Sequence, residues 1–346
     1  SLRVLDGAVL VLCAVGGVQA QSLTIDRQMR RYHVPRLAFI NKMDRIGADP
    51  FKVVRQLRER LGCDAVLMQL PLGREASFEG VIDLISMTAE YFDGDNGETV
   101  RTEPIPEALA AEAHAARQQM LESLSMYSDE ILERLLSEEP VPEDLVHQVI
   151  HAAVVGQQLT PVFLGSAYRN KGVQPLLDAV VRYLPSPLES DVQALAHDDP
   201  HQRVPLVADP EKPTVAMAFK IVADPYGTLT FMRIYQGKFV KGESYYNQRT
   251  GRKERFGRIV RMHADEREET DSACAGEIVA VLGTDCSSGD TYASEYPYCT
   301  LQKMYVPEPV IKMAIEAVDR DGADRLGKAL RRFAREDPTL QVSTDD

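Results

Sequence analysis

Residues 36–44 read Arg36-Leu-Ala-Phe-Ile-Asn-Lys-Met-Asp44, an apolar run that ends directly in Asn-Lys-Met-Asp. A short continuous apolar run is typical of a strand that is covered on both faces of a parallel sheet. Asn41, Lys42 and Asp44 then stand at the carboxyl end of that strand, where open α/β sheets bind their ligands. This stretch therefore predicts an α/β fold with a ligand loop at residues 41–44.

The Asp44 carboxylate suits one purine better than the other. It offers two acceptor oxygens, and guanine presents N1–H and an exocyclic NH₂ side by side, so the two can pair bidentately. Adenine lacks this donor pair and would leave a buried charge unpaired, which rejects the wrong ligand strongly. Asn41 can donate to N7 of the base, and the Lys42 stem can lie along the base plane. We therefore predict that this loop recognises guanine.

A second loop, Gly165-Ser166-Ala167, follows another buried strand at residues 161–165. Backbone N–H groups in so tight a turn can donate to guanine O6, and the Ser166 hydroxyl can brace Asp44. Taken alone, the tripeptide is an ordinary strand-to-helix turn. Combined with the loop at residues 41–44, it favours a guanine-binding slot that Ser166 and Ala167 close.

Strands and helices alternate through the first half of the chain, beginning with the apolar run Gly7–Val15, which predicts a parallel sheet. A plain strand–helix–strand unit takes about 30 residues. The two guanine loops are much farther apart, so a long segment is inserted between them. Residues of about 65–158 contain short strands and then helical periodicity over 107–137. We expect an inserted α+β subdomain there, within a first domain at residues 1–187.

Beyond Pro187 the pattern changes. Residues 188–211 are polar, acidic and proline-containing, which favours a linker. Period-two alternation and regularly spaced glycines over 212–306 predict an antiparallel β-barrel. After Pro307, residues 311–315 alternate as a strand, and a helical stripe ends before Pro338. One strand and one helix cannot bury a core, so residues 307–346 are expected to be the truncated start of an α+β, ferredoxin-like third domain.

The composition excludes several classes of protein. The formal net charge is −13, from 39 Lys and Arg against 52 Asp and Glu. Phosphate binding needs clustered cations, so a general nucleic-acid coat protein is excluded, although local basic patches are not. The five cysteines form no C-x-x-C pair, which fits a reducing compartment. The longest apolar run is far shorter than the roughly 20 residues needed to span a bilayer, so no membrane partner is expected.

Basic residues cluster in the predicted barrel. Six of them fall within residues 249–261, opposed only by Glu254: Arg249, Arg252, Lys253, Arg255, Arg258 and Arg261. On a hairpin, alternation would place several on one face as a phosphate-facing stripe. A solvated, charged hairpin fits the same pattern. The stripe supports an alternative function, a non-catalytic ribosome- or RNA-binding module in which the sheet domain is only structural.

His147 and His151 stand four residues apart, the spacing of a zinc-binding helix. The general-base Glu of a metalloprotease is missing, because Gln148 follows the first histidine. No third ligand is evident. We interpret both as surface or packing histidines, with a zinc hydrolase as a remote alternative.

The whole chain resembles the elongation factor G family, the translational GTPases that drive translocation on the ribosome. The resemblance lies in the combination of these stretches: Asn41–Ala48, Gln69–Gly73, Pro161–Ala167, Asn170–Gln174, Tyr183–Pro187, Ala218–Lys220, Asp224–Pro225, Gly251–Lys253, Arg261–Ala264, Ser288–Thr291, Val306–Val310 and Arg332–Pro338. Tyr91–Asp95 and Asp285–Gly289 look closer to the mitochondrial-type branch, which some bacteria also carry. Tyr168 and Arg169 depart from the usual leucine and lysine.

The resemblance implies a partial P-loop GTPase domain that binds GTP or GDP through Asn41, Lys42, Asp44, Ser166 and Ala167. It implies a parent GTPase that moves tRNA and mRNA through the ribosome, in the cytoplasm or the mitochondrial matrix, as a monomer. The ribosome would be the partner, with Arg249, Arg252, Lys253, Arg255 and Arg258 as candidate contacts.

The family's phosphate loop and its Mg²⁺-binding segment would lie before Ser1, and no G-x-x-x-x-G-K-[ST] occurs in residues 1–346. Phosphate and metal contacts supply most of the chemistry of phosphoryl transfer. We therefore predict that no catalytic residue lies in this polypeptide, that it hydrolyses no GTP by itself, and that it binds guanine nucleotide weakly.

Overall fold

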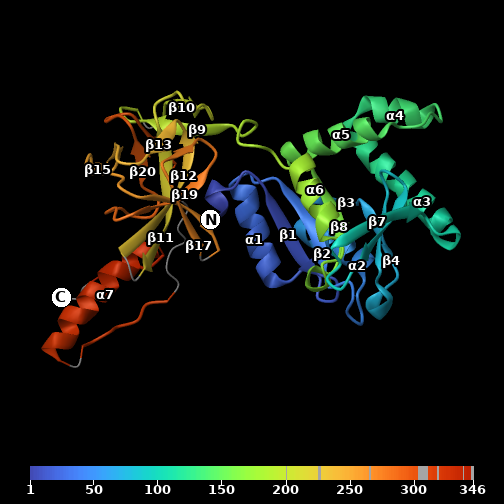
Figure 1. The fold of residues 1–346 in the computed structure, drawn as a ribbon, viewed down its shortest axis with the longest axis horizontal. Helices are drawn as coiled ribbons and strands as arrows, with labels where there is room; N and C mark the ends of the chain where they lie inside the picture. The colour runs from blue at the N-terminus through green and yellow to red at the C-terminus, as the bar shows by residue number, and fades with distance from the viewer. Residues whose placement is uncertain are drawn as a thin grey trace. The chain divides into compact units, whose positions relative to one another are not determined.

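The structure is a computed structural model that describes residues 1–199, 201–224, 227–264, 266–302, 311–317, 319–337 and 339–343. The chain forms two compact units (Figure 1). One contains residues 2 and 4–185, and the other contains residues 1, 3 and 186–346. No helix in these described ranges is long and apolar enough to cross a bilayer.

A parallel sheet of four strands lies at the centre of the first unit, in the order β1-β2-β8-β3. The strands are β1 (Ala8–Cys13), β2 (Arg36–Asn41), β3 (Asp64–Leu67) and β8 (Leu159–Leu164). Three helices belong to this α/β layer: α1 (Ala20–Arg31), α2 (Pro50–Leu61) and α6 (Val173–Tyr183) (Figure 1). The predicted α/β class with a parallel sheet is confirmed.

Strand β2 shows why its sequence is apolar throughout. Leu37 and Phe39 pack into one hydrophobic cluster together with residues of α6. Ala38 and Ile40 point the other way, into a cluster with residues of α1 and α2. Successive side chains of a strand alternate between faces, so burial on both faces requires the unbroken apolar run of the sequence.

The inserted segment forms a second sheet and three helices. Antiparallel strands β4 (Gln69–Leu72), β5 (Gly80–Asp83), β6 (Thr88–Asp93) and β7 (Thr99–Pro104) pair in chain order. Helices α3 (Glu107–Leu124), α4 (Asp129–Leu136) and α5 (Glu143–Val155) follow.

The structure differs from the expectation at the start of this insert. Residues 65–67 belong to β3 of the parallel sheet, where Val66 pairs with Pro161. The reason is burial on both faces, because Ala65 and Val66 enter opposite hydrophobic clusters.

The second unit contains curved antiparallel sheets, in agreement with the predicted barrel. Its largest sheet has the strand order β15-β14-β20-β11-β12-β19-β16-β17 within the described residues. These strands are β11 (Val215–Asp224), β12 (Gly227–Gln236), β14 (Ser244–Asn247), β15 (Lys253–Arg255), β16 (Ile259–His263), β17 (Glu266–Thr270), β19 (Ile278–Leu282) and β20 (Thr291–Ala293). A separate pair joins β13 (Lys238–Val240) to β18 (Ser272–Cys274).

Residues 188–211, expected to be a linker, contain two strands instead. Strand β9 (Val192–Ala196) pairs with β10 (Arg203–Leu206) and with β21 (Cys299–Leu301). The inward-facing Ala194 and Leu206 are buried despite the polar composition around them. The expectation of a linker is therefore corrected, because a few alternating small apolar residues suffice once a partner strand is available.

The last part of the chain contains helix α7 (Arg320–Glu336), as predicted. The strand expected at 311–315 is not formed: residues 311–317 have no strand assignment, and Ile311, Met313 and Ile315 are exposed. A strand needs a neighbour for its backbone hydrogen bonds, and none of the described residues pairs with this segment. The expected motif at 306–310 lies outside the described residues.

Candidate functional site

The two predicted loops meet at the carboxyl ends of β2 and β8, which are neighbours in the parallel sheet. Met43 N donates to Gly165 O at 3.1 Å, and Gly165 N donates to Ile40 O at 3.0 Å. The Ser166 hydroxyl donates to Asp44 Oδ1 at 2.7 Å. Residues 122 positions apart in the chain thus share one site.

Asn41 ties the loops together through its side-chain carbonyl. Its Oδ1 accepts from Lys42 N at 2.7 Å and from Ala167 N at 2.9 Å. Backbone N–H groups of the turn at residues 165–167 were predicted to donate to guanine O6, and one of them, that of Ala167, donates to Asn41 in this structure. The amide NH₂ of Asn41 is the part of this side chain that can donate to a base.

Lys42 has an unusual backbone conformation, with φ at 67° in the left-handed region. For a residue with a side chain this conformation costs on the order of 1 kcal/mol or more, and such residues concentrate at ligand sites. The sharp turn lets Met43 enter the core while Lys42 stays exposed. The exposed Lys42 is thereby available to cover a ligand at the strand end.

Asp44 is held as a carboxylate. Its side chain is 21% exposed, and partial burial alone would raise its pKa, but hydrogen bonds from Ser166 and Arg169 outweigh burial and lower it. Each oxygen has its own donor, because Arg169 Nε reaches Asp44 Oδ2 at 3.2 Å. The role of Arg169 was not foreseen from the sequence, where it appeared only as a departure from the family pattern.

Gly165 and a short bridge fix the second loop. A side chain at Gly165 would collide with the Lys171 carbonyl and with the Phe39 ring. Ser166 N donates to Lys171 O at 2.9 Å, and Lys171 N donates back to Ser166 O at 3.1 Å. Only glycine lets the loop lie this close to β2, so the position of Ser166 beside Asp44 depends on it.

The inserted subdomain touches the back of this second loop. A Cβ at Gly97, in the turn between β6 and β7, would lie 2.7 Å from Arg169 O and 2.9 Å from Asn170 O. Gln174 Nε2, on α6, donates to Gly97 O at 2.8 Å. The subdomain and the candidate site are therefore in direct contact through backbone atoms.

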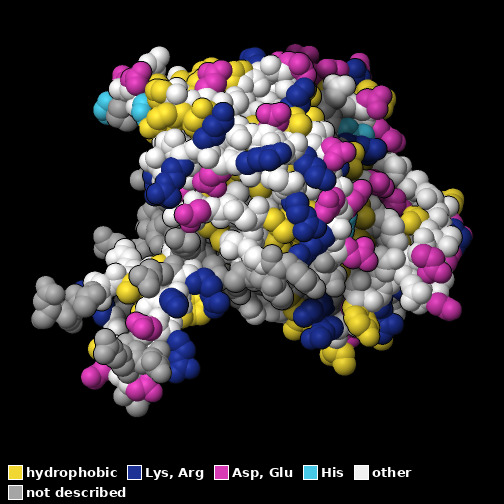
Figure 2. Space-filling model, turned by 60° about the vertical axis from the view of Figure 1, so that its left-hand side comes forward, with side chains coloured by type: hydrophobic (Ala, Val, Ile, Leu, Met, Phe, Trp, Pro, Cys, Tyr) yellow, Lys and Arg dark blue, Asp and Glu magenta, His cyan; other side chains and the backbone are white. Residues whose placement is uncertain are grey.

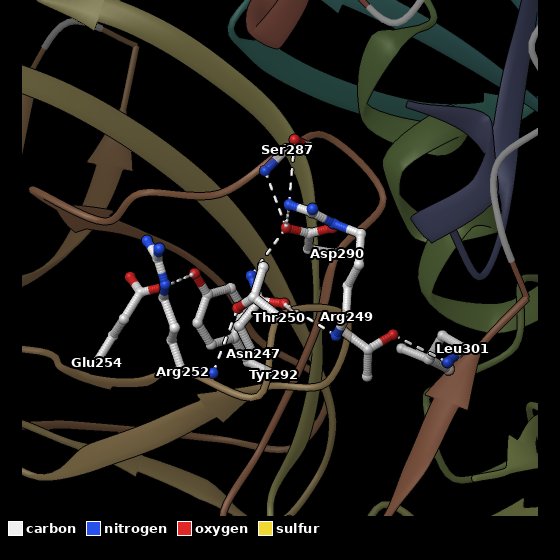
Figure 3. Close-up of polar contacts among 10 residues, drawn as sticks. Asn247, Arg249, Thr250, Arg252, Glu254, Ser287, Asp290, Tyr292 and Leu301 are labelled. Carbon is white, nitrogen blue, oxygen red and sulfur yellow. Dashed lines mark hydrogen bonds and ion pairs between the residues drawn. The ribbon is translucent and has the colours of Figure 1, made fainter.

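The basic residues of the barrel are not a uniform cationic face. The half-exposed Arg249 pairs with the buried Asp290, with Nε 2.6 Å from Oδ1 and Nη2 2.9 Å from Oδ2 (Figure 3). Asp290 is 4% exposed and also accepts from Asn247 Nδ2 at 2.8 Å and from Ser287 N at 2.9 Å. This cluster links the turn after β14 to the loop before β20, so Arg249 has a structural role.

The neighbouring basic residues also have partners. Arg258 lies 2.5 Å from Glu269, and Arg261 lies 2.7 Å from Glu277. Arg255 Nε donates to Gly242 O, Arg252 is 3.8 Å from Asp285, and Lys253 lies over the Tyr246 ring. Basic and acidic side chains are mixed over the face shown in Figure 2. Three of the six, Arg249, Arg258 and Arg261, are thus closely paired with carboxylates, so the expected stripe is neutralised in part.

His147 and His151 contact protein groups. His147 Nε2 is 3.1 Å from Arg182 Nη1 and therefore accepts, which leaves Nδ1 to donate to the Tyr183 hydroxyl at 2.6 Å. Burial and then Arg182 lower the pKa of His147. His151 Nδ1 lies 3.1 Å from Arg182 O. These contacts give the histidines packing roles in the first unit.

Metal ligands need to converge. Across the described residues, no three His, Cys, Asp or Glu side chains lie together in a way that could hold an ion. We therefore assign no metal site among these residues and derive no catalytic step through a metal ion.

Three family models match the chain in order. Residues 1–186 match the elongation factor Tu GTP binding domain, and residues 227–293 match elongation factor Tu domain 2. Residues 306–346 match elongation factor G domain III. The chain belongs to the elongation factor G family. The order of a GTPase domain, a barrel-like domain and domain III agrees with the fold predicted from the sequence.

Similar proteins carry the same family name. Elongation factor G of Rhodopirellula baltica is 60% identical over 346 residues, which cover 100% of this chain and 50% of that protein. Elongation factor G-1, mitochondrial, of Arabidopsis thaliana is 46% identical over 345 residues, which cover 100% of this chain and 46% of that protein. A crystal structure of a protein from Thermus thermophilus matches with a TM-score of 0.81 and 26% identity, over 99% of this chain and 49% of that one. The chain spans about half the length of the curated relatives it matches.

Removing the Ser166 hydroxyl tests the bond that joins the loops. Ser166→Ala is expected to raise the pKa of Asp44, because that carboxylate loses a donor. The free energy of unfolding should fall by about 1 kcal/mol, the usual contribution of one hydrogen bond. An NMR pH titration of the Asp44 carboxyl carbon measures the first effect. The exposed Ser77→Ala is the control, and an Asp44 pKa that is unchanged in Ser166→Ala would contradict the geometry.

Removing the Asp290 charge tests the barrel cluster. Asp290→Asn is expected to lower the free energy of unfolding by about 1–3 kcal/mol at pH 7. This is less than for a fully buried ion pair, because Arg249 is half-exposed and solvent screens its charge. Burial alone would raise the pKa of Asp290, but its donors lower it, so its stabilisation is present above the unfolded pKa near 4 and disappears as the pH falls below that. Denaturant unfolding between pH 2 and 7 measures this.

The matched control for Asp290→Asn is Arg252→Gln, which removes an exposed pair 3.8 Å apart. It should change the free energy of unfolding by less than about 0.5 kcal/mol. Equal effects of the two variants at pH 7 would show that Asp290 has no special role.

Proposed function

We propose that this chain recognises the guanine base of GTP and GDP as part of a GTPase of elongation factor G type. In proteins of this type, GTP hydrolysis drives the movement of tRNA and mRNA through the ribosome. One observation carries the proposal: the loops at residues 41–44 and 165–167 form one site in which Ser166 donates to Asp44 at 2.7 Å.

The proposed base recognition follows from the donors and acceptors of this site. Asp44 is an ionised acceptor pair at the carboxyl end of β2, matched to the N1–H and NH₂ edge of guanine. Asn41 contributes an amide donor and Lys42 contributes its stem. The backbone N–H of Ala167 holds the Asn41 side chain in place by donating to its Oδ1. An adenine base in the same slot would leave the Asp44 charge unpaired, which disfavours ATP.

The 346-residue polypeptide on its own is proposed to lack GTP hydrolysis. Cradling of the phosphates and a metal ion provide most of the stabilisation in phosphoryl transfer. The sequence contains no G-x-x-x-x-G-K-[ST], and we assign no catalytic residue within it. Affinity for the nucleotide should accordingly be weak, since the base contributes only part of the binding energy.

The ribosome is the proposed partner of the parent protein, and a purely RNA-binding module is not favoured, because the first 186 residues match a GTP binding domain. Of the candidate contacts, Arg249 is committed to Asp290 and Arg258 to Glu269. Arg252, Lys253 and Arg255 are exposed and are the better candidates for phosphate contact.

We propose a monomer that works wherever its ribosomes are, in a bacterial cytoplasm or, as the alternative, in a mitochondrial matrix. Bacterial and mitochondrial relatives both match over the full chain. The mitochondrial-type branch stays a prediction based on residues 91–95 and 285–289.

Changing the base-reading carboxylate tests the proposal. Asp44→Asn should weaken GDP binding by about 10- to 100-fold, since it removes a charge-assisted pair. Binding of XDP should strengthen, because the altered edge of xanthine offers an acceptor to the new amide. Ligand-observed NMR titrations with GDP, XDP and ADP reach the millimolar range that this polypeptide requires.

The matched control is Glu59→Gln, which removes one exposed negative charge from α2 of the same unit. It should leave the order of the three affinities unchanged. If Asp44→Asn keeps the base preference of the unmodified chain, the guanine-binding proposal is wrong.

Steady GTP turnover is expected to be absent from the purified 346-residue chain. Phosphate release measured with GTP and Mg²⁺ provides the test, with full-length elongation factor G of Rhodopirellula baltica as the positive control. Sustained turnover that co-purifies with the chain and is lost in Asp44→Asn would contradict the expectation.

A further inference from the structure

Arg169 occupies part of the surface that the proposed base would use. Its Nε donates to Asp44 Oδ2 at 3.2 Å, on the oxygen that Ser166 does not hold. The Arg169 side chain is 61% exposed, and Asp44 is 21% exposed. The contact is therefore an ion pair at the rim of the slot, with the arginine on the solvent side.

The two groups that can meet Asp44 have the same recognition chemistry. A guanidinium is a planar carbon bearing three nitrogens, with parallel N–H donors that match a carboxylate. The N1–C2–N2 edge of guanine is also a planar carbon with neighbouring N–H donors. The Asp44 carboxylate can therefore pair with either the guanidinium of an arginine or the N1–C2–N2 edge of guanine. Both of these donors need the outer lone pairs of Asp44 Oδ2.

The backbone around Arg169 leaves its side chain independent of the loop. Arg169 ends the short helical turn Ala167–Arg169, and its N–H donates to Ser166 O at 3.1 Å. Asn170 follows with φ at 50°, and its N–H donates to Ala167 O. These bonds hold the turn without the guanidinium, so the side chain can leave Asp44 while Ser166 keeps its place.

We propose that Arg169 is an internal competitor of guanine, which binds Asp44 Oδ2 and must leave it before the base can pair with that carboxylate. The inference rests on the proposed guanine-binding function and adds a residue that sets the affinity. It makes Arg169 a specificity-determining residue that acts by occupying the acceptor rather than by contacting the nucleotide.

Exposed ion pairs contribute little, so the competition is a modest one. Pairs of this kind measure about 0.2–1 kcal/mol. Releasing Asp44 from Arg169 should therefore tighten guanine binding by about 1.4- to fivefold. A residue that only helped to position Asp44 would have the opposite effect, because its loss would weaken binding.

The test compares GDP and guanosine affinities of the full chain and of Arg169→Gln by NMR titration. Arg45→Gln is the matched control, since Arg45 is an exposed arginine just beyond the loop at residues 41–44 and its removal changes the net charge equally. Thermal unfolding of each variant verifies that the fold is kept. We expect Arg169→Gln to bind both ligands about 1.4- to fivefold more tightly than Arg45→Gln does.

A double-mutant cycle of Arg169→Gln and Asp44→Asn distinguishes competition for Asp44 from a purely structural role of Arg169. In the Asp44→Asn background the carboxylate is gone, so adding Arg169→Gln should leave the affinity for XDP unchanged. If Arg169→Gln increased the affinity for the nucleotide equally with Asp44 and with Asp44→Asn, the proposed competition between Arg169 and guanine would be wrong.

The outcomes separate the two ideas. If the unmodified chain prefers GDP to ADP but Arg169→Gln binds GDP equally or more weakly than Arg45→Gln, the competitor role of Arg169 is wrong while guanine recognition stands. If no variant distinguishes GDP from ADP, the proposed function fails and the competitor role fails with it.

Discussion

The parallel pairing of β2 with β8 is the constraint on which the site depends. It aligns Ile40 with Leu164 and so delivers both loops to the same edge of the sheet. The hydrogen bond from Ser166 to Asp44 then spans 122 residues of chain. Without that strand pairing, the polar residues at 41–44 would be an isolated turn with no second wall. The apolar runs that precede each loop therefore matter as much to the site as the polar residues themselves.

Close backbone approach is the second requirement. Gly165 has no room for a side chain between the Lys171 carbonyl and Phe39, and Lys42 accepts a left-handed conformation so that Met43 can be buried. Both features have a conformational or entropic cost. In return, a backbone bond from Met43 to Gly165 joins the loops beside the side-chain bonds of Asn41 and Ser166, so the Asp44 carboxylate has a defined direction.

Features that depend on local pattern could be predicted from the sequence. The strand at residues 36–41, the second loop at 165–167 and the α7 helix all follow from short-range periodicity or turn chemistry. Partners far apart in the chain could not be predicted. Asp290 lies beyond several strands from Arg249, so the arginine was interpreted as a surface cation. The same limit hid β9 within a polar segment and made residues 311–315 look like a strand, because strand formation is decided by a neighbour and not by the segment alone.

The contact at Gly97 couples the inserted subdomain mechanically to the segment that follows the loop at residues 165–167. The turn between β6 and β7 abuts the carbonyls of Arg169 and Asn170, with no side chain between them to cushion a shift. Backbone in such contact transmits displacement almost rigidly, since packed interiors are barely compressible. A displacement of the turn between β6 and β7 would therefore be passed on to Arg169 and Asn170, which directly follow the loop at residues 165–167.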